Sequence, residues 1–211
     1  MAYPLLRHLV VPLVLRHIGR IEGEENIPLD RPFLAASNHV SYVEPALLAA
    51  VIVRATGQRI YALTWYRIWR VFHAFGLAGW LGMVPVVPAE PGKVLHHAME
   101  MIARGHPILI FPEGKRNFDG GLLKAHTGAA RLALLSGIPV LPIGYQGPPA
   151  RTIAGSLGIF FRDGKQLRVT IGTPLVFPKM HQDELTRERL DGVSRDIMIE
   201  IGKLCNQPYQ H

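Results

Sequence analysis

The amino-acid sequence predicts an α/β fold: a single domain with a mostly parallel central sheet flanked by helices, preceded by an N-terminal membrane-associating helical segment. Three observations support this prediction. Short β-type runs alternate with longer helical patterns, which is typical of βα units. The 211 residues are 48% hydrophobic, which suffices for the core of one domain. The amino terminus is apolar with basic residues between its apolar runs. We therefore expect a membrane-associating segment at 1–20 and a folded domain at 21–211.

The amino-terminal segment reads YPLLRHLVVPLVLRHIGR over residues 3–20. Its longest run without Arg or His, residues 9–15, is far shorter than the roughly 20 residues that a membrane-spanning helix needs. The basic residues do not gather on one helical face. A short helix kinked near Pro12 that dips into the bilayer, with its arginines reaching the headgroups, fits this pattern. A core helix capped by basic residues fits it about equally well.

Five β-type runs follow along the chain, each bounded by turn residues. They are PFLAAS (32–37), RIYALT (59–64), PILIFP (107–112), PVLPIGYQ (139–146) and LRVTIG (167–172). Helical patterns cover residues 45–55, 65–75, 91–104 and 127–137. An amphipathic closing helix is predicted by apolar residues that recur every three or four positions, namely Leu190, Val193, Ile197, Ile201 and Leu204.

Residues 71–88 form a second apolar stretch, interrupted only by His73. Its length alone would suit a membrane span, but its glycines and prolines would break one helix repeatedly. We expect a helix that ends near Phe75, a glycine-rich loop, and a short strand around residues 84–87. The three tryptophans lie in or beside this stretch. Such aromatic residues suit a membrane interface, although a core stripe at helical spacing is the more frequent meaning of the pattern.

The formal charge of +7 favours an anionic partner, which would be nucleic acid, an acidic membrane or a phosphate-bearing substrate. The 23 Lys and Arg are scattered without a nucleic-acid-binding motif, and the mean hydropathy is +0.17. We therefore expect membrane or phosphorylated lipid and no nucleic acid. The single Cys205 excludes an internal disulfide and gives no sign of an oxidising compartment. We expect a protein at the cytoplasmic face of a membrane, without a metal site.

Polar clusters follow two of the predicted strands, at the carboxyl ends where open α/β sheets bind ligands. The first contains Asn38, His39 and Glu44, and the second reads EGKRN over residues 113–117. His39 and Glu44 are five positions apart, which separates their side chains on a strand or a helix, so only a turn can join them. Pro45 favours a helix start at this point, which places Glu44 at the mouth of that helix.

A carboxylate bonded to one imidazole nitrogen fixes the tautomer and makes the other nitrogen a better general base. His39 with Glu44 could therefore deprotonate a substrate hydroxyl. Taken alone, the pair more often means a helix-starting acid and a loop histidine. The second cluster changes the balance, because Gly114 can expose backbone amides after the strand while Lys115 and Arg116 supply charge for a phosphate. Glu113 could order the arginine or bind a substrate hydroxyl.

These residues resemble the lysophosphatidic acid acyltransferases, also called 1-acylglycerol-3-phosphate acyltransferases, within the glycerolipid acyltransferase superfamily. The resemblance runs from about residue 23 to 178. SNHVSYVEP matches the family's N-H-x-x-x-x-D block and FPEGKRN matches F-P-E-G-T-R-S, the most specific block. GMVPVVP, GIPVLPI and LLKAHTGAARLAL, which includes Lys124, resemble further blocks in family order.

The resemblance implies that residues 21–211 are an acyltransferase catalytic domain. It would move a fatty acyl group from the thioester of acyl-CoA or acyl carrier protein to the hydroxyl of a lysolipid, without a cofactor. His39 would be the general base and Glu44 its partner. The substrate-binding residues would come from the two clusters and the lysine block, namely Asn38, Glu113, Gly114, Lys115, Arg116 and Lys124. No G-x-S-x-G run is present, which agrees with transfer that forms no acyl-enzyme.

Two departures from the family pattern bear on function. Glu44 stands where the family usually has aspartate, so the loop must absorb one additional methylene, and we expect Glu44 to remain functional. Pro88 stands where the family commonly has an arginine that binds the acceptor phosphate. Either Lys115, in place of the usual threonine, supplies that charge, or the acceptor is a glycolipid or another lipid without a simple terminal phosphate. A catalytically decayed lipid-binding protein and a thioesterase are the alternatives from other classes.

Overall fold

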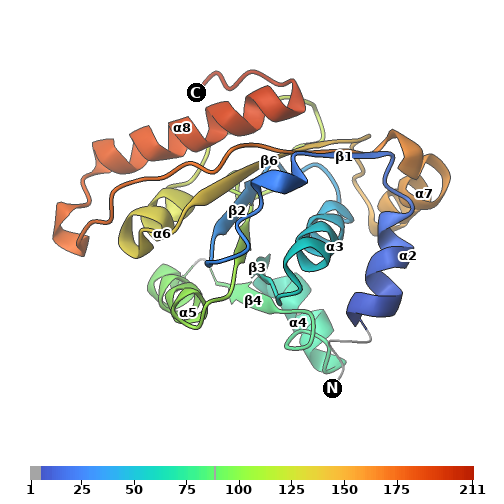
Figure 1. Ribbon diagram of the computed structural model, residues 1–211, viewed down its shortest axis with the longest axis horizontal. Coiled ribbons are helices and arrows are strands. Elements are labelled where there is room, and N and C mark those ends of the chain that lie inside the picture. Colours follow the sequence, from blue (N-terminus) through green and yellow to red (C-terminus); the bar gives the residue numbers. More distant parts are fainter. Residues whose placement is uncertain (1–5, 88) are drawn as a thin grey trace.

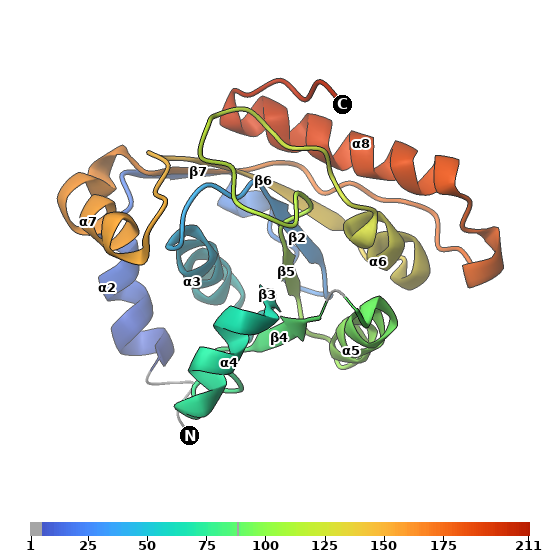
Figure 2. The same cartoon turned by 180° about the vertical axis from the view of Figure 1, so that it is seen from behind.

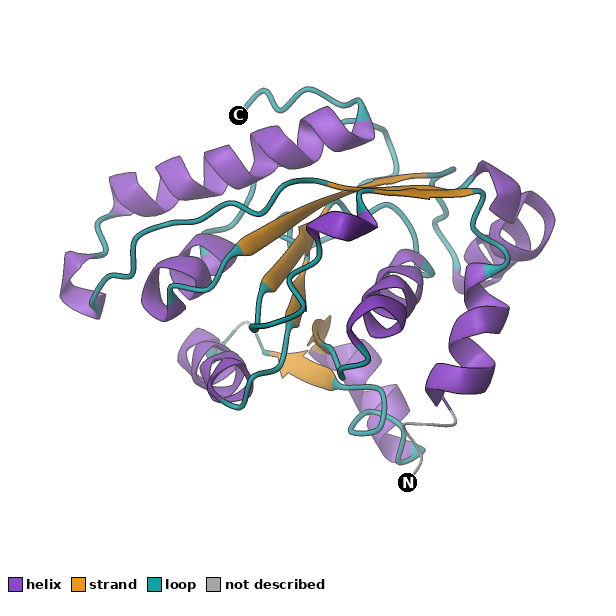
Figure 3. Cartoon of the chain, viewed as in Figure 1, coloured by secondary structure: helices purple, strands orange, loops and turns teal. Residues whose placement is uncertain are grey.

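A seven-stranded sheet forms the centre of the protein in the computed structural model, which describes residues 6–87 and 89–211. The spatial order is β1-β7-β6-β2-β5-β3-β4, and neighbours pair in parallel except for β6 and β7. The strands are β1 (Arg20–Glu22), β2 (Leu34–Ser37), β3 (Tyr61–Trp65), β4 (Met83–Val86), β5 (Ile108–Ile110), β6 (Val140–Gln146) and β7 (Arg168–Ile171). The predicted α/β class with a mostly parallel sheet is therefore confirmed (Figure 3).

The helices expected from the sequence are present within a few residues of their predicted bounds. They are α3 (Glu44–Thr56), α4 (Tyr66–Ala74), α5 (Pro91–Ala103), α6 (Gly128–Ser136) and α8 (Arg187–Cys205). The short 3-10 turns are η2 (Glu24–Asn26), η3 (Gly164–Gln166) and η4 (Gln182–Glu184). The sequence reading missed α7 (Ile153–Asp163) and β1. Two glycines weaken the helical signal of α7, and β1 has only three residues at the sheet edge.

Helices cover both faces of the sheet. Successive side chains of β2 point to opposite faces, and the side chains on each face pack against helices. Ala35 packs in a core with residues of α2, α3 and α7, whereas Leu34 and Ala36 pack in a second core with residues of α5, α6 and α8. A strand that is buried on both faces reads as an apolar run, and β2 (LAAS) is apolar except for its last residue, the buried Ser37. Figure 1 shows α2, α3 and α7 together on one side and α5, α6 and α8 on the other.

The amino-terminal segment forms a π-helical turn, η1 (Leu6–Val10), followed by α2 (Val11–Leu15), so the helix changes type next to Pro12. Val11 and Leu15 are buried in the core, while Leu9 and Leu13 remain more than half exposed. The segment therefore contributes to the core on one face and offers apolar side chains to its surroundings on the other. Residues 1–5 lie outside the described residues, and the boundary at 20/21 stays a prediction.

The aromatic stretch folds as the sequence predicted, into α4, a glycine-containing turn and β4. No residue of α4 is buried, and Trp65 and Phe75 expose 51% and 76% of their surfaces. The core-stripe interpretation of these aromatics is therefore wrong, because the stripe has no core to face. Within the described part of the chain, no helix has both the length and the apolar content that crossing a bilayer requires.

Candidate active site

His39 and Glu44 meet in the turn between β2 and α3, as the sequence spacing predicts. The distance between His39 Nδ1 and Glu44 Oε1 is 2.5 Å. Glu44 is the first residue of α3, and Pro45 follows it in the first turn. The start of a helix attracts a negative group, since its first backbone N–H groups have no partner inside the helix. Sequence and local structure together therefore explain why the carboxylate lies beside the imidazole.

The Glu44 carboxylate is fully buried and receives four donors. Oε1 accepts from the backbone N–H groups of Val40 (2.7 Å) and Ser41 (2.8 Å) in addition to the imidazole. Oε2 accepts from the Ser41 hydroxyl. These donors come from the same turn, which therefore accommodates a glutamate at this position. The carboxylate is fixed in place before any substrate binds.

The His39 ring is held on a second side by Phe111, at the end of β5. The two ring centres are 4.2 Å apart and the planes differ by 23°, a stacked arrangement. Because Nδ1 is engaged with Glu44, we assign the proton to Nδ1, which leaves the Nε2 lone pair free to accept a proton. The side chain keeps 16% of its surface exposed, so a substrate can reach the ring.

The second cluster is joined to the first through Glu113. Its carboxylate, almost fully buried, accepts the backbone N–H of His39 at Oε1 (2.9 Å) and that of Leu123 at Oε2 (2.8 Å). Burial raises the pKa of Glu113, while these two N–H groups and His39 act in the opposite direction. The N–H of Asn117 donates to the carbonyl of His39 (2.8 Å). These bonds join the two clusters that follow β2 and β5, and Figure 2 brings the connection from β5 to α6 to the front.

Three cationic side chains belong to the predicted substrate-binding set. The Arg116 guanidinium carbon lies 3.5 Å from the centre of the Tyr42 ring, a cation–π contact, and its Nε is buried without a hydrogen-bond partner among the described residues. Lys115 and Lys124 are exposed, and neither forms an ion pair with a described residue. Gly114 has φ = +68°, the left-handed conformation that the sequence predicted for it. Contact of these four residues with substrate stays a prediction.

Asn38 is completely buried, and its side chain fixes the backbone of β6. Its Nδ2 donates to the carbonyl of Tyr145 (2.9 Å), and its Oδ1 accepts the N–H of the same residue (2.8 Å). These bonds hold the end of β2, and hence His39, against the neighbouring strand. Asn38 and Glu113 thus position the turn that carries His39, and their contact with substrate stays a prediction.

Sequence reasoning missed other residues that shape the site. Ser41 was detectable, since Ser-x-x-Glu is the sequence pattern of a capping box, although α3 begins at Glu44 with Val43 as its N-cap and no capping box forms. Ser156 of α7 is fully buried and accepts the N–H of Tyr42 (3.0 Å), and no sequence signal indicates it because the contact spans 114 positions. In the described residues no group of three or more His, Cys, Asp or Glu is placed to hold a metal ion.

A mostly parallel α/β sheet with a buried histidine–carboxylate pair at its carboxyl edge is typical of enzymes that use a general base. The comparison with known proteins makes this class specific. Residues 19–146 match the Acyltransferase family, and the chain belongs to that family.

The chain resembles proteins named 1-acyl-sn-glycerol-3-phosphate acyltransferase. It is 31% identical over 161 residues to a chloroplastic one from Brassica napus, covering 74% of this chain and 44% of that protein. It is 27% identical over 210 residues to one from Bacillus subtilis, covering 94% of each. The chain thus spans less than half the length of the Brassica relative. The crystal structure of the acyltransferase PlsC from Thermotoga maritima shares the fold, with a TM-score of 0.63 and 19% identity over 99% of this chain and 84% of the other.

Proposed function

We propose that this protein transfers a fatty acyl group from acyl-CoA or acyl carrier protein to the free hydroxyl of 1-acylglycerol 3-phosphate, at the cytoplasmic surface of a membrane. The observation that carries the proposal is the 2.5 Å contact between His39 Nδ1 and a fully buried Glu44 carboxylate. It leaves Nε2 as the base and agrees with the reaction named for the relatives. The assembled pair also argues against a decayed lipid-binding protein.

The reaction then proceeds without a covalent acyl-enzyme. Nε2 of His39 removes the proton from the acceptor hydroxyl while Glu44 stabilises the imidazolium that forms. The hydroxyl oxygen attacks the thioester carbonyl and forms a tetrahedral oxyanion. The C–S bond breaks as the carbonyl reforms, and the thiol leaves with the proton that His39 carries. The products are an ester and a free thiol. A thioester is already activated, so the protein has mainly to orient the substrates and provide the base.

The charge of the acceptor is the finer part of the proposal. Lys115 and Arg116 lie in the connection that also carries Glu113, which binds the catalytic turn. Pro88, at the position of the family arginine, lies outside the described residues. We propose that Lys115 contributes the charge that Pro88 cannot supply. The second candidate, an acceptor without a terminal phosphate, follows from the same substitution.

Lys115→Thr separates these two acceptors. For a phosphate-bearing lysolipid the KM should rise about five-fold, since an exposed charge pair contributes about 1 kcal/mol. For a neutral acceptor such as a monoacylglycerol the KM should not change. Equal changes with both acceptors, or none with either, would remove the compensating role of Lys115.

The function itself is tested with a labelled acyl thioester and a panel of lysolipids. We expect a labelled diacyl product from wild-type protein and none from His39→Ala. His96→Ala removes an exposed histidine of α5 and serves as the matched control with full activity. Free fatty acid as the sole product would indicate a thioesterase, and binding without any product would indicate a lipid-binding protein.

A further inference from the structure

A groove of about 500 Å³ lies between the amino-terminal segment and α3, away from the site at His39. His39 and Glu44 lie at the first turn of α3, whereas Arg54, which lines the groove, lies in its last turn. Arg54 follows Glu44 by ten positions, and a helix rises about 1.5 Å per residue, so the two residues are separated by about 15 Å along the helix axis. The lining residues are Arg7, His8, Val11, Pro12, Leu15, Arg16 and Arg54.

The groove is cationic, and no acidic residue lines it. Arg54 is neutralised by Glu24, with 2.6 Å between Nη2 and Oε1. Arg7 and Arg16 have exposed side chains that form no hydrogen bond or ion pair within the described residues. The Arg7 guanidinium lies against Gly57, where a Cβ would be 2.8 Å from Nη1, so it is beside the carboxyl end of α3. Two unpaired cations therefore lie at the rim.

The floor and the surroundings of the groove are apolar. Val11 and Leu15 line it and are almost fully buried. Next to it, Leu9 and Leu13 expose 63% and 51% of their surfaces. This arrangement suits a phospholipid. The cationic groups can bind its anionic phosphate, and the apolar floor and exposed leucines can contact its apolar part.

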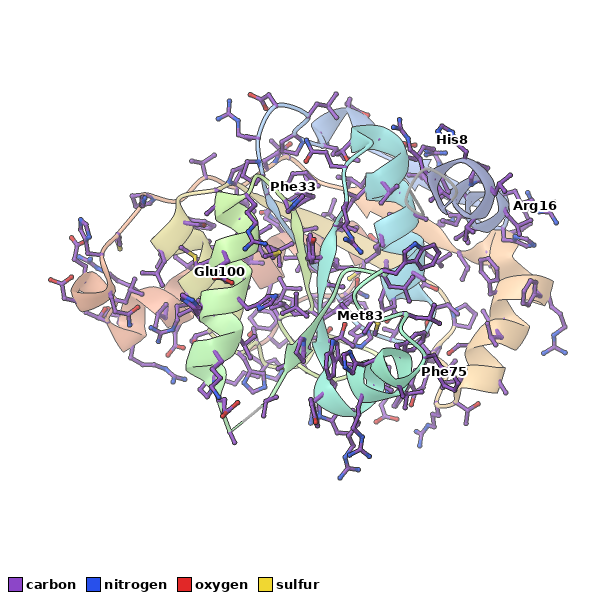
Figure 4. The ribbon with its side chains drawn as sticks, turned by 90° about the horizontal axis from the view of Figure 1, so that it is seen from below. His8, Arg16, Phe33, Phe75, Met83 and Glu100 are labelled. Carbon is purple, nitrogen blue, oxygen red and sulfur yellow. The ribbon has the colours of Figure 1, made fainter. Side chains whose placement is uncertain are left out.

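The neighbouring helix α7 extends this apolar surface. Ile153, Leu157 and Phe161 are exposed at four-residue spacing, which places them along one face of the helix. The ring of His17 lies 5.6 Å from that of Phe161 and so links the amino-terminal segment to α7. Figure 1 shows α2 and α7 side by side, and Figure 4 shows His8 and Arg16 at that end of the molecule.

We propose that this groove binds the headgroup of an anionic phospholipid while the exposed residues of α2 and α7 enter the bilayer. It is a second lipid site, separate from the acceptor site, and it does not depend on the acyl-transfer reaction. The occupant is a bilayer lipid because a free phosphate would use the arginines alone and would leave the apolar side chains in water.

The proposal is tested by binding the full chain to vesicles, which requires no turnover. Vesicles of phosphatidylcholine with 20% phosphatidylglycerol should bind Arg7→Gln/Arg16→Gln with an affinity about 30-fold lower than that of the wild type. Each cation near an anionic bilayer contributes roughly a factor of five to the affinity. Lys179→Gln/Arg195→Gln removes two exposed charges outside the groove and should bind like the wild type. His39→Ala should bind normally too, which separates this test from that of the reaction.

Two further arms complete the test. Leu13→Ser should weaken binding without any loss of charge, and inorganic phosphate at constant ionic strength should not displace the protein from the vesicles. The proposal is overturned if Arg7→Gln/Arg16→Gln binds like the wild type, or if the control pair loses as much affinity. Displacement by inorganic phosphate alone would also overturn it, since the groove would then be a site for the free ion.

Discussion

The role of Glu44 can be tested by Glu44→Gln, a substitution that keeps the shape of the side chain and removes its charge. The glutamine carbonyl can take the place of Oε1 and keep the bonds from His39, Val40 and Ser41. The amide nitrogen then faces the Ser41 hydroxyl, which can rotate to accept from it. The tautomer of His39 and the fold are therefore retained, and what is lost is the charge that stabilises the imidazolium.

The magnitude follows from the kind of hydrogen bond that changes. A bond to a charged group contributes about 1.5–3 kcal/mol and a neutral one about 1 kcal/mol, so the transition state loses about 0.5–2 kcal/mol. This loss corresponds to a fall in kcat of about 2- to 30-fold. Glu44→Ala should do more, because it leaves the buried N–H groups of Val40 and Ser41 without an acceptor. Each contributes about 1–3 kcal/mol of destabilisation, so the unfolding free energy should fall by about 2–6 kcal/mol.

The assay is the release of thiol from acyl-CoA with 1-acylglycerol 3-phosphate present, together with thermal unfolding of each variant. Glu44→Gln should lose rate at nearly unchanged Tm, and Glu44→Ala should lose both. Glu200→Gln removes a partly exposed carboxylate of α8, which pairs with Lys203 at the surface, and is the matched control. If both Glu44 variants kept the wild-type rate while His39→Ala abolished it, Glu44 would not assist His39 in catalysis.

Three other predictions concern stability and reactivity. Asn38→Ala breaks both hydrogen bonds to Tyr145 and should lower Tm by about 6–12 °C. About 3 kcal/mol of stability is lost, and each kcal/mol shifts the Tm of a chain of this size by about 2–4 °C. An unchanged Tm would contradict this prediction. Burial raises the pKa of Cys205 to about 11, so the native thiol should resist alkylation at pH 8 and react only after denaturation. Fast labelling of the native protein would contradict this prediction. The raised pKa of Glu113 means that its stabilising contribution is present below pH 4.5 and is lost as the pH rises through its folded-state pKa. The unfolding free energy of Glu113→Gln, measured with denaturant, should therefore fall less over that pH range than that of the wild type. If the unfolding free energy had the same slope against pH in both proteins, the raised pKa of Glu113 would be refuted.

The turn that joins His39 to Glu44 was predictable because local chemistry determines it. A buried strand followed by a histidine, a carboxylate and a proline permits few arrangements, and the structure adopts the one in which a turn brings His39 to Glu44. The convergence with the second cluster was predictable for a topological reason, since β2 and β5 are parallel neighbours and their carboxyl ends meet. Gly114 adopts the positive φ that its position after the strand required.

The remaining features depend on contacts between distant parts of the chain. Ser156 holds the N–H of Tyr42, but it lies on α7, which has no clear periodic signal in the sequence. The stacking of Arg116 on Tyr42 joins two loops whose paths are fixed only by the folded sheet. The aromatic residues of α4 have the spacing of a core helix, and only the tertiary structure shows that no residue of this helix is buried. Local sequence patterns thus located His39 and Glu44, whereas the contacts that hold the surrounding loops depend on the tertiary structure.

The central claim is that His39 activates the acceptor hydroxyl directly, and the dependence of thiol release on the acceptor tests it best. Protein and acyl-CoA are mixed without lysolipid, and thiol release and the intact mass of the protein are measured before and after 1-acylglycerol 3-phosphate is added. We predict an unmodified mass throughout and thiol release only after the acceptor is added, with none from His39→Ala. Release without acceptor, an acylated protein, or an active His39→Ala variant would contradict the account.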